Sequence, residues 1–392
     1  MIKLGNTSKT ILLILVIILC VLRSYSATRT ATSSGNWSNT ATWGGNPVPT
    51  ASDDVTINNG INVTVNAAAY CNTLTTANSG TLTISGTNTL TVTGLINMFR
   101  PSANNTSFTI AVGTGSLVAG ALTMNATTTT RNNIITISTG TVTINGTVTT
   151  GTTGCQFVFT GNGLLKFGGS FSGGPASLTA ANGTIEYTGT APVIQAFTGN
   201  YYNLVYSGNG TTANPSGNLN IQGNLLNTGG GTLNFYARNV SLSGTTVSNT
   251  IDGFTTTGTV TMSKTAGTAT FTGNVNASVL TINGSGGTLN LGTGLTHTVT
   301  GNWTRTNGTL DGGSSLLKIA GSVSGTGGSF AANTGTIEWN AAGAQTLAAV
   351  AYNNLILSGG GAKTMPAGTA ITNNLLINGP TASIAAGQNI SV

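Results

Sequence analysis

Two glutamates, Glu186 and Glu338, are the residues of this chain best suited to acid–base chemistry. They are the only glutamates, and they occupy matched phrases, GTIEYTG at 183–189 and GTIEWNA at 335–341. Two carboxylates ~5–9.5 Å apart are the machinery of glycoside hydrolysis. The other interpretation is one structural residue present in two copies of a repeat. The choice depends on how far apart the fold holds the two residues.

The other titratable residues are scattered along the chain. His297 is the only histidine; it has no clustered second ligand for a metal and no nucleophile elbow around it, so we expect an outward-facing strand residue. Asp252 and Asp311 each precede a glycine, which is typical of turns. The adjacent Asp53 and Asp54 would point to opposite sides of a strand. The sequence therefore predicts no catalytic residue, no metal site and no cofactor.

Short strand-like runs must position these residues. Runs such as TLTV and TVTM alternate apolar residues with Thr, the period-two pattern of a strand with one buried face, and Gly-rich clusters separate them as turns. The runs recur about every 19 to 20 residues, a unit that buries its apolar face only when copies stack. The pattern predicts an all-β fold, a right-handed parallel β-helix (β-solenoid). An antiparallel β-sandwich array would instead show unit boundaries about every 100 residues.

A long repeat spans 163–242 and 315–392, with GLLKF at 163–167 matching SLLKI at 315–319. Counting the runs between the copies at about 19 residues each gives eight coils. Strands stack ~4.8 Å apart, so eight coils would separate the two glutamates by roughly 38 Å. This distance favours the structural interpretation of the glutamates over the catalytic one.

Within each copy, a lysine and a glutamate are 20 residues apart: Lys166 with Glu186, and Lys318 with Glu338. A coil of that length places them side by side on the outer surface. We expect each pair to bridge adjacent coils, with a contribution of roughly 0.2–1 kcal/mol. The pairs would also hold the register, because a slip of one residue would bury both charges.

The N-terminal residues 1–26 have the pattern of a signal peptide. Lys3 and Lys9 precede the apolar run at 11–22, and Ser26 ends a small-residue cleavage site. The predicted organisation is completed by two further segments. These are an N-terminal cap with the first strands at 27–60 and the β-solenoid at 61–392.

The chain without residues 1–26 has nine basic and six acidic residues in no cluster. Nucleic-acid binding would need a basic stripe, so we expect no such partner. Membrane contact is expected only through the signal peptide or a sorting domain missing from the sequence. Cys71 and Cys155 would lie about four coils, or roughly 20 Å, apart, beyond the ~7 Å reach of a disulfide.

Two surfaces are candidates for binding. Trp37 and Trp43 lie in the least repetitive stretch, 34–57, and would either cap the open end of the solenoid or form an exposed platform for a glycan. Thr-x-Thr runs such as Thr81/Thr83 would form files on a flat face, an arrangement that some ice-binding proteins use. Their irregular spacing, and the suitability of Thr for any outward strand position, favour a plain surface.

The phrases SGNWSNTATWGGNPVPTASDDVTI at 34–57 and GTIEWNAAGAQTLAAVAYNNLILSGGGAKTMPAG at 335–368 resemble the repetitive Thr/Gly/Asn-rich β-solenoid surface proteins of type IX-secreting Gram-negative bacteria. The resemblance implies a secreted or surface-displayed adhesin or matrix protein with no catalytic residues. Such proteins commonly end in a sorting domain. Here QNISV at 388–392 aligns with RNVSL at 238–242 in mid-coil, so we expect a chain truncated at its C-terminus.

The sequence therefore predicts a non-catalytic adhesin-like rod that is secreted or held on the outer cell surface. Its expected partners are an extracellular glycan, matrix or a host surface protein, bound through Thr/Asn-rich faces. The alternatives are a polysaccharide-active β-helix enzyme, which would gather several acids in one groove, and an ice-binding protein, which would align Thr in straight files.

Overall fold

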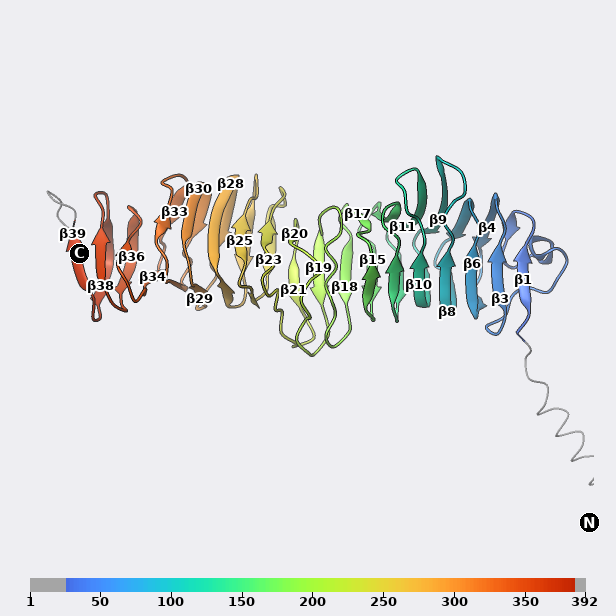
Figure 1. Ribbon diagram of the computed structural model, residues 1–392, viewed down its shortest axis with the longest axis horizontal. Coiled ribbons are helices and arrows are strands. Elements are labelled where there is room, and N and C mark those ends of the chain that lie inside the picture. The colour runs from blue at the N-terminus through green and yellow to red at the C-terminus, as the bar shows by residue number, and fades with distance from the viewer. Residues whose placement is uncertain (1–25, 385–392) are drawn as a thin grey trace, which may run out of the picture.

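The chain forms a parallel β-helix of about 16 turns. The structure is a computed structural model and describes residues 26–384. Figure 1 shows an elongated rod in which strands follow one another along the long axis in chain order, from β1 at one end to β39 at the other. The predicted fold class is confirmed. Residues 1–25 of the predicted signal peptide and the QNISV segment lie outside the described residues.

Each turn of the chain carries three strand segments, so the rod has three faces. In one turn these are β14 (Cys155–Phe159), β15 (Leu164–Phe167) and β16 (Phe171–Gly173). The next strand, β17 (Ser177–Thr179), pairs in parallel with β14 and so starts the following turn. We name the faces after these strands: the β14 face, the β15 face and the β16 face.

The β14 face is built of one strand segment from each turn. Its members are β2 (Gly35–Asn36), β4 (Ile61–Val65), β7 (Gly80–Ile84), β9 (Thr106–Val112), β11 (Arg131–Ile137), β14, β17, β20 (Leu219–Ile221), β22 (Val240–Leu242), β25 (Thr259–Met262), the first parts of β28 (Val279–Asn290) and β30 (Trp303–Asp311), and β32 (Val323–Ser324).

The β15 face follows next along each turn. Its members are β5 (Ala69–Cys71), the first parts of β8 (Thr89–Met98) and β10 (Ser116–Met124), β12 (Thr141–Ile144), β15, β18 (Thr184–Tyr187), β19 (Asn203–Tyr206), β21 (Leu225–Asn227), β23 (Ser248–Ile251), β26 (Thr268–Phe271), the last parts of β28 and β30, and β33 (Ser329–Ala331).

The β16 face completes the turn. Its members are β1 (Thr28–Ala31), β3 (Asp54–Ile57), β6 (Thr73–Thr76), the last parts of β8 and β10, β13 (Val148–Thr150), β16, β24 (Phe254–Thr255), β27 (Val275–Ala277), β29 (Thr296–Val299), β31 (Leu316–Ile319), β34 (Thr336–Trp339), β36 (Ala351–Leu357) and β38 (Ala370–Ile377). At the C-terminal end, β35 (Gln345–Thr346), β37 (Ala362–Met365) and β39 (Thr381–Ile384) form a separate three-stranded sheet.

The interior is a stack of apolar side chains, one layer per turn. Leu165 pairs with Ile185, which pairs with Leu204, and all three are buried. Each such side chain contributes about 1.5–3 kcal/mol through its removal from water. The alternating pattern of the sequence therefore places apolar residues inside and Thr, Ser and Asn outside, as predicted.

The turns differ in length more than the sequence suggests. Paired residues are 20 apart between β15 and β18, as in Thr184 opposite Leu164, but 28 apart between β7 and β9, as in Phe108 opposite Gly80. The extra residues lie in loops between strands, such as 99–105 between β8 and β9, which leave the rod near the labels β9 and β11 in Figure 1. The spacing of 19–20 residues therefore applies to turns such as that from β15 to β18, and most turns between 60 and 160 are longer.

The two copies of the long repeat lie on different faces. Lys166 and Glu186 are on the β15 face, whereas Lys318 and Glu338 are on the β16 face. The predicted count of eight coils is wrong. Leu204 of β19 pairs with Leu225 of β21, and not with β20, the next strand along the chain. The copies are therefore offset by seven turns and one further face.

Candidate functional site

The first lysine–glutamate pair bridges adjacent turns on the β15 face. Lys166 of β15 pairs with Glu186 of β18 in the strand register. Lys166 Nζ lies 3.0 Å from Glu186 Oε2. On the next turn, the hydroxyl of Ser207 donates a hydrogen bond of 2.6 Å to Glu186 Oε1. Three successive turns are thus joined through one carboxylate.

The second copy reproduces this arrangement on the β16 face. Lys318 Nζ lies 3.4 Å from Glu338 Oε2, and the hydroxyl of Ser358 donates to Glu338 Oε1 at 2.6 Å. The serine was missed by the sequence reasoning. Its signal was available, because Ser207 and Ser358 occupy the same place in YNLVYSG and NNLILSG.

The two glutamates are too far apart to act on one bond. From β18, seven strand pairings along the β15 face lead to β33, and Glu338 follows on the next face. At ~4.8 Å per step this is roughly 34 Å, against ~5–9.5 Å for the carboxylates of a glycosidase. Each glutamate belongs instead to its own lysine–glutamate–serine ladder.

The N-terminal aspartates hold the first turn of the rod. Asp53 accepts hydrogen bonds from the backbone and hydroxyl of Thr50, both at 2.8 Å, and its Oδ2 lies 3.7 Å from Nε of Arg29. Burial opposes ionisation of this carboxyl, but the combined hydrogen bonds from Thr50 and Ala27 outweigh it, so the pKa of Asp53 is lowered. Hydrogen bonds, first among them that from Thr73, also lower the pKa of Asp54.

The other two aspartates stabilise corners of the rod. Asp252 accepts from the backbone of Asn227 at 2.7 Å and from the hydroxyl of Thr272. Asp311 accepts from the backbone of its turn residue Gly313 at 2.8 Å. The contact of Asp311 is the turn chemistry expected of an aspartate before a glycine, whereas Asp252 joins neighbouring turns of the rod.

His297 is buried, which corrects the expectation of an outward-facing residue. Only 2% of its surface is exposed. Its Nδ1 accepts a hydrogen bond of 3.1 Å from the backbone of Val275, so the proton is on Nε2, which donates to the carbonyl of Leu291 at 2.8 Å. Burial lowers the pKa of this imidazole. The signal was its spacing: His297 and Val299 are two residues apart on β29, and both point inward.

The tryptophans form a cap and not an exposed platform. Trp37 and Trp43 are 2% and 0% exposed, so neither ring can stack on a glycan. Their rings meet edge to face with centroids 4.9 Å apart, and Trp43 Nε1 donates to the carbonyl of Trp37 at 2.7 Å. Trp37 directly follows β2, and Trp43 is the last residue of the short helix η1 (Thr40–Trp43), which packs against β1 and β2 of the first turn.

The two cysteines are separate buried thiols, as predicted. Cys71 is on the β15 face and Cys155 is on the β14 face, and both are free. Burial raises the pKa of Cys71 to about 12 and also raises that of Cys155. Neither thiol is therefore activated as a nucleophile.

Two lysines point into the rod, which the sequence did not predict. Lys264 Nζ donates to Asn249 Oδ1 at 2.5 Å, and Lys363 Nζ donates to the carbonyl of Ala341 at 2.7 Å. Both side chains are fully buried, and burial lowers the pKa of each amine. Lys264 thereby binds an inward-facing side chain of β23, and Lys363 binds the corner that follows β34.

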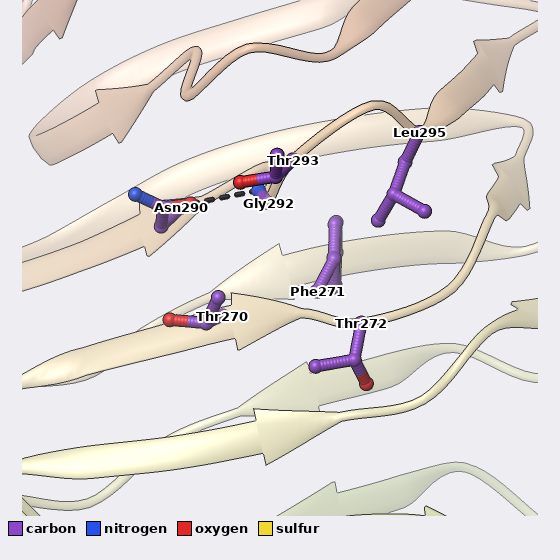
Figure 2. Close-up of a pocket in the computed structure, with 7 residues that line it drawn as sticks. All are labelled: Thr270, Phe271, Thr272, Asn290, Gly292, Thr293 and Leu295. Atoms are coloured by element: carbon purple, nitrogen blue, oxygen red, sulfur yellow. Dashed lines mark hydrogen bonds between the residues drawn. The ribbon is translucent and has the colours of Figure 1, made fainter.

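A surface hollow of about 370 Å³ lies beside β26 and β28. Figure 2 shows that its lining is mostly Thr and Asn, with Phe271 and Leu295 as the apolar members. Asn290 Oδ1 accepts from the backbone of Gly292 at 2.7 Å and is thereby fixed. Asp252 and Asp311 accept hydrogen bonds from two lining residues, Thr272 and Asn290. Three strand pairings, or roughly 14 Å along the rod, separate the two aspartates, which is too far for a catalytic carboxylate pair.

The most regular outer surface is the C-terminal half of the β14 face, which we call the polar face. Six strand segments, from β20 to β32, present two files of side chains there. The first file is Asn220, Ser241, Thr261, Thr281, Thr304 and Ser324, each paired with the next in the register. The second file is Asn218, Asn239, Thr259, Val279, Asn302 and Ser322.

The polar face contains neither charge nor aromatic side chains in its two files, whereas each of the other faces carries a lysine–glutamate ladder. Within residues 26–384 there is no group of three or more His, Cys, Asp or Glu placed to hold a metal ion. The same residues include no helix long and apolar enough to cross a bilayer. No protein-family model matches this chain, and neither a curated protein nor a solved structure is significantly similar to it.

Proposed function

We propose that this chain is a non-catalytic, secreted or cell-surface rod that acts as a stalk or adhesin and contacts extracellular glycan or matrix through its outward polar side chains. The observation that carries the proposal is the stacking itself. About 16 turns at ~4.8 Å each give a rod of roughly 75 Å, whose surface is made of hydroxyl and amide groups. A rod of this kind spans distance and offers repeated contacts.

The roles of the charged residues support a structural protein. The two glutamates and two of the lysines join adjacent turns, and the four aspartates hold the first turn and the corners. A polysaccharide-active enzyme would need several of these acids around one bond. The register instead distributes them along the rod.

The experiment is to fuse the C-terminal sorting domain of a host protein to the full chain, in a Gram-negative host that has type IX secretion, and to follow the export of the fusion. We expect surface labelling of intact cells, a mature N-terminus at Ala27, and adhesion of the labelled cells to glycan- or matrix-coated plates. Retention of the chain inside the cell would contradict the proposal.

The enzyme alternative has its own measurement. The purified chain is incubated with polysaccharides, and new reducing ends are measured beside the double variant Glu186→Gln/Glu338→Gln. We expect no release from either protein. Release that the double substitution abolishes would establish the enzyme.

A further inference from the structure

We infer that the polar face binds an extended, uncharged polysaccharide that lies along the rod. This inference rests on the proposed adhesin function and assigns it a surface and a ligand class. The first file provides one hydroxyl or amide side chain on each of six consecutive turns. Neighbouring members are ~4.8 Å apart along the rod, so the file presents a regular row of polar groups to a straight polymer.

The central hydroxyls of the file are available to a ligand. Thr261, Thr281 and Thr304 are partly exposed and have no protein hydrogen-bond partner for their hydroxyls among the described residues. A free hydroxyl both donates and accepts, which matches the hydroxyls of a sugar. Thr is β-branched and has few rotamers, so binding orders little that the fold has not already ordered.

The second file adds fixed amide donors. Asn218, Asn239 and Asn302 each accept a backbone hydrogen bond of 2.9 Å from the following turn through Oδ1. These contacts fix the amide planes and leave each Nδ2 without a protein partner among residues 26–384. The face therefore combines oriented donors with free hydroxyls.

The composition of the two files defines the ligand class. Their lack of charge disfavours acidic polymers, which are usually bound by Lys and Arg. Their lack of aromatic rings means that a sugar would be held by hydrogen bonds at its hydroxyl edge and not by stacking. Single contacts of this kind are weak, so affinity must come from many contacts at once, as a repeating polymer provides.

The test is cosedimentation of the purified full chain with insoluble cellulose and chitin, at low salt and in 1 M NaCl. We expect binding to at least one of these neutral polymers that salt does not weaken, because salt screens only charge–charge contacts. The double variant Thr261→Tyr/Thr281→Tyr should bind about tenfold more weakly, since bulky rings lift the polymer off the file. The matched control is Thr75→Tyr/Thr123→Tyr, two outward threonines on the β16 face, which should bind normally.

Several outcomes would overturn the inference. They are no binding to either neutral polymer, binding that 1 M NaCl abolishes, and equal loss in the two double variants. Inhibition of ice growth by the chain without polymer binding would assign the files to ice instead. Export to the cell surface is measured separately, so a chain that is displayed and adheres but is unaffected at Thr261 and Thr281 refutes this inference and leaves the proposed function intact.

Discussion

At the scale of single residues, the buried imidazole of His297 makes stability depend on pH. His297 is neutral in the fold, with one ring nitrogen bonded to Val275 and the other to Leu291. Its folded pKa is lowered by burial, so the unfolded chain binds a proton more readily than the folded chain. The contribution of His297 to stability is therefore fully present above the unfolded pKa of about 6.5. It is lost as the pH falls through the lower pKa of the folded chain.

The variant His297→Gln tests this pH dependence. The free energy of unfolding is measured by urea titration with circular dichroism at pH 8 and at pH 5. From pH 8 to pH 5, it should fall further for the wild-type chain than for the variant. The contributions of Asp53 and Asp54, whose pKa values are lowered from 3.8, fall in a separate window at lower pH. Equal losses for both proteins between pH 8 and pH 5 would contradict the assignment.

The lysine–glutamate ladders make a second prediction for single residues. A double-mutant cycle with Lys166→Met and Glu186→Gln should give a coupling below about 1 kcal/mol, because partly exposed pairs are screened by water. The coupling should shrink in 1 M NaCl. Lys318 and Glu338 provide the internal comparison. A coupling of several kcal/mol that is insensitive to salt would show that the pair acts as a buried one.

At one corner of the rod, four successive turns carry a glycine. Gly115, Gly140, Gly163 and Gly183 precede β10, β12, β15 and β18, and the carbonyl of each accepts from the turn that follows. A Cβ on Gly140 would lie 2.3 Å from the carbonyl oxygen of Gly115. The glycine column therefore lets successive turns stack at strand spacing.

Gly140→Ala should destabilise the rod by about 1–3 kcal/mol, the usual effect of forcing an atom into a packed position. The measurement is the free energy of unfolding in urea. Gly343→Ala is the matched control, because a Cβ there meets nothing within 4 Å, and it should change stability by less than about 0.5 kcal/mol. Similar values for the two variants would refute the role of the column.

Most elements could be predicted from period-two alternation, and some could not for a physical reason. Leu165, Ile185 and Leu204 stack as the pattern indicates because each lies in an alternating run. The segment after Leu204 contains Ser, Gly and Asn and forms only isolated bridges such as Val193 with Ala213. With no apolar period there, the sequence could not show which later run faces Leu204. The binding hypothesis for Trp37 failed because burial of a ring depends on the turn that folds over it.

At the scale of the whole molecule, a turn is a removable unit. β25, β26 and β27 make up one turn, and residues 259–278 contain all three. They pair on one side with β22, β23 and β24, and on the other with β28 and β29. Stability in a solenoid is approximately a sum over turns and their neighbours, so the remaining turns can close the gap.

Deletion of residues 259–278 should give a folded rod that is about 4.8 Å shorter. X-ray scattering in solution measures the length, and circular dichroism shows whether the strands are kept. Deletion of 259–268 is the control, since half a turn places the following strands on the wrong faces. A folded protein from the half-turn deletion, or an unfolded one from the full-turn deletion, would contradict the three-faced architecture.

The placement of the two long repeats on different faces has a consequence for how such a chain lengthens. Matching phrases form strands on the β15 face in one copy and on the β16 face in the other, so a duplicated gene fragment does not have to encode a whole number of turns. Duplications in steps of a single side are then tolerated. Such duplications would place copies of one surface feature around the axis of the rod as well as along it. The same sequence motif then faces more than one direction.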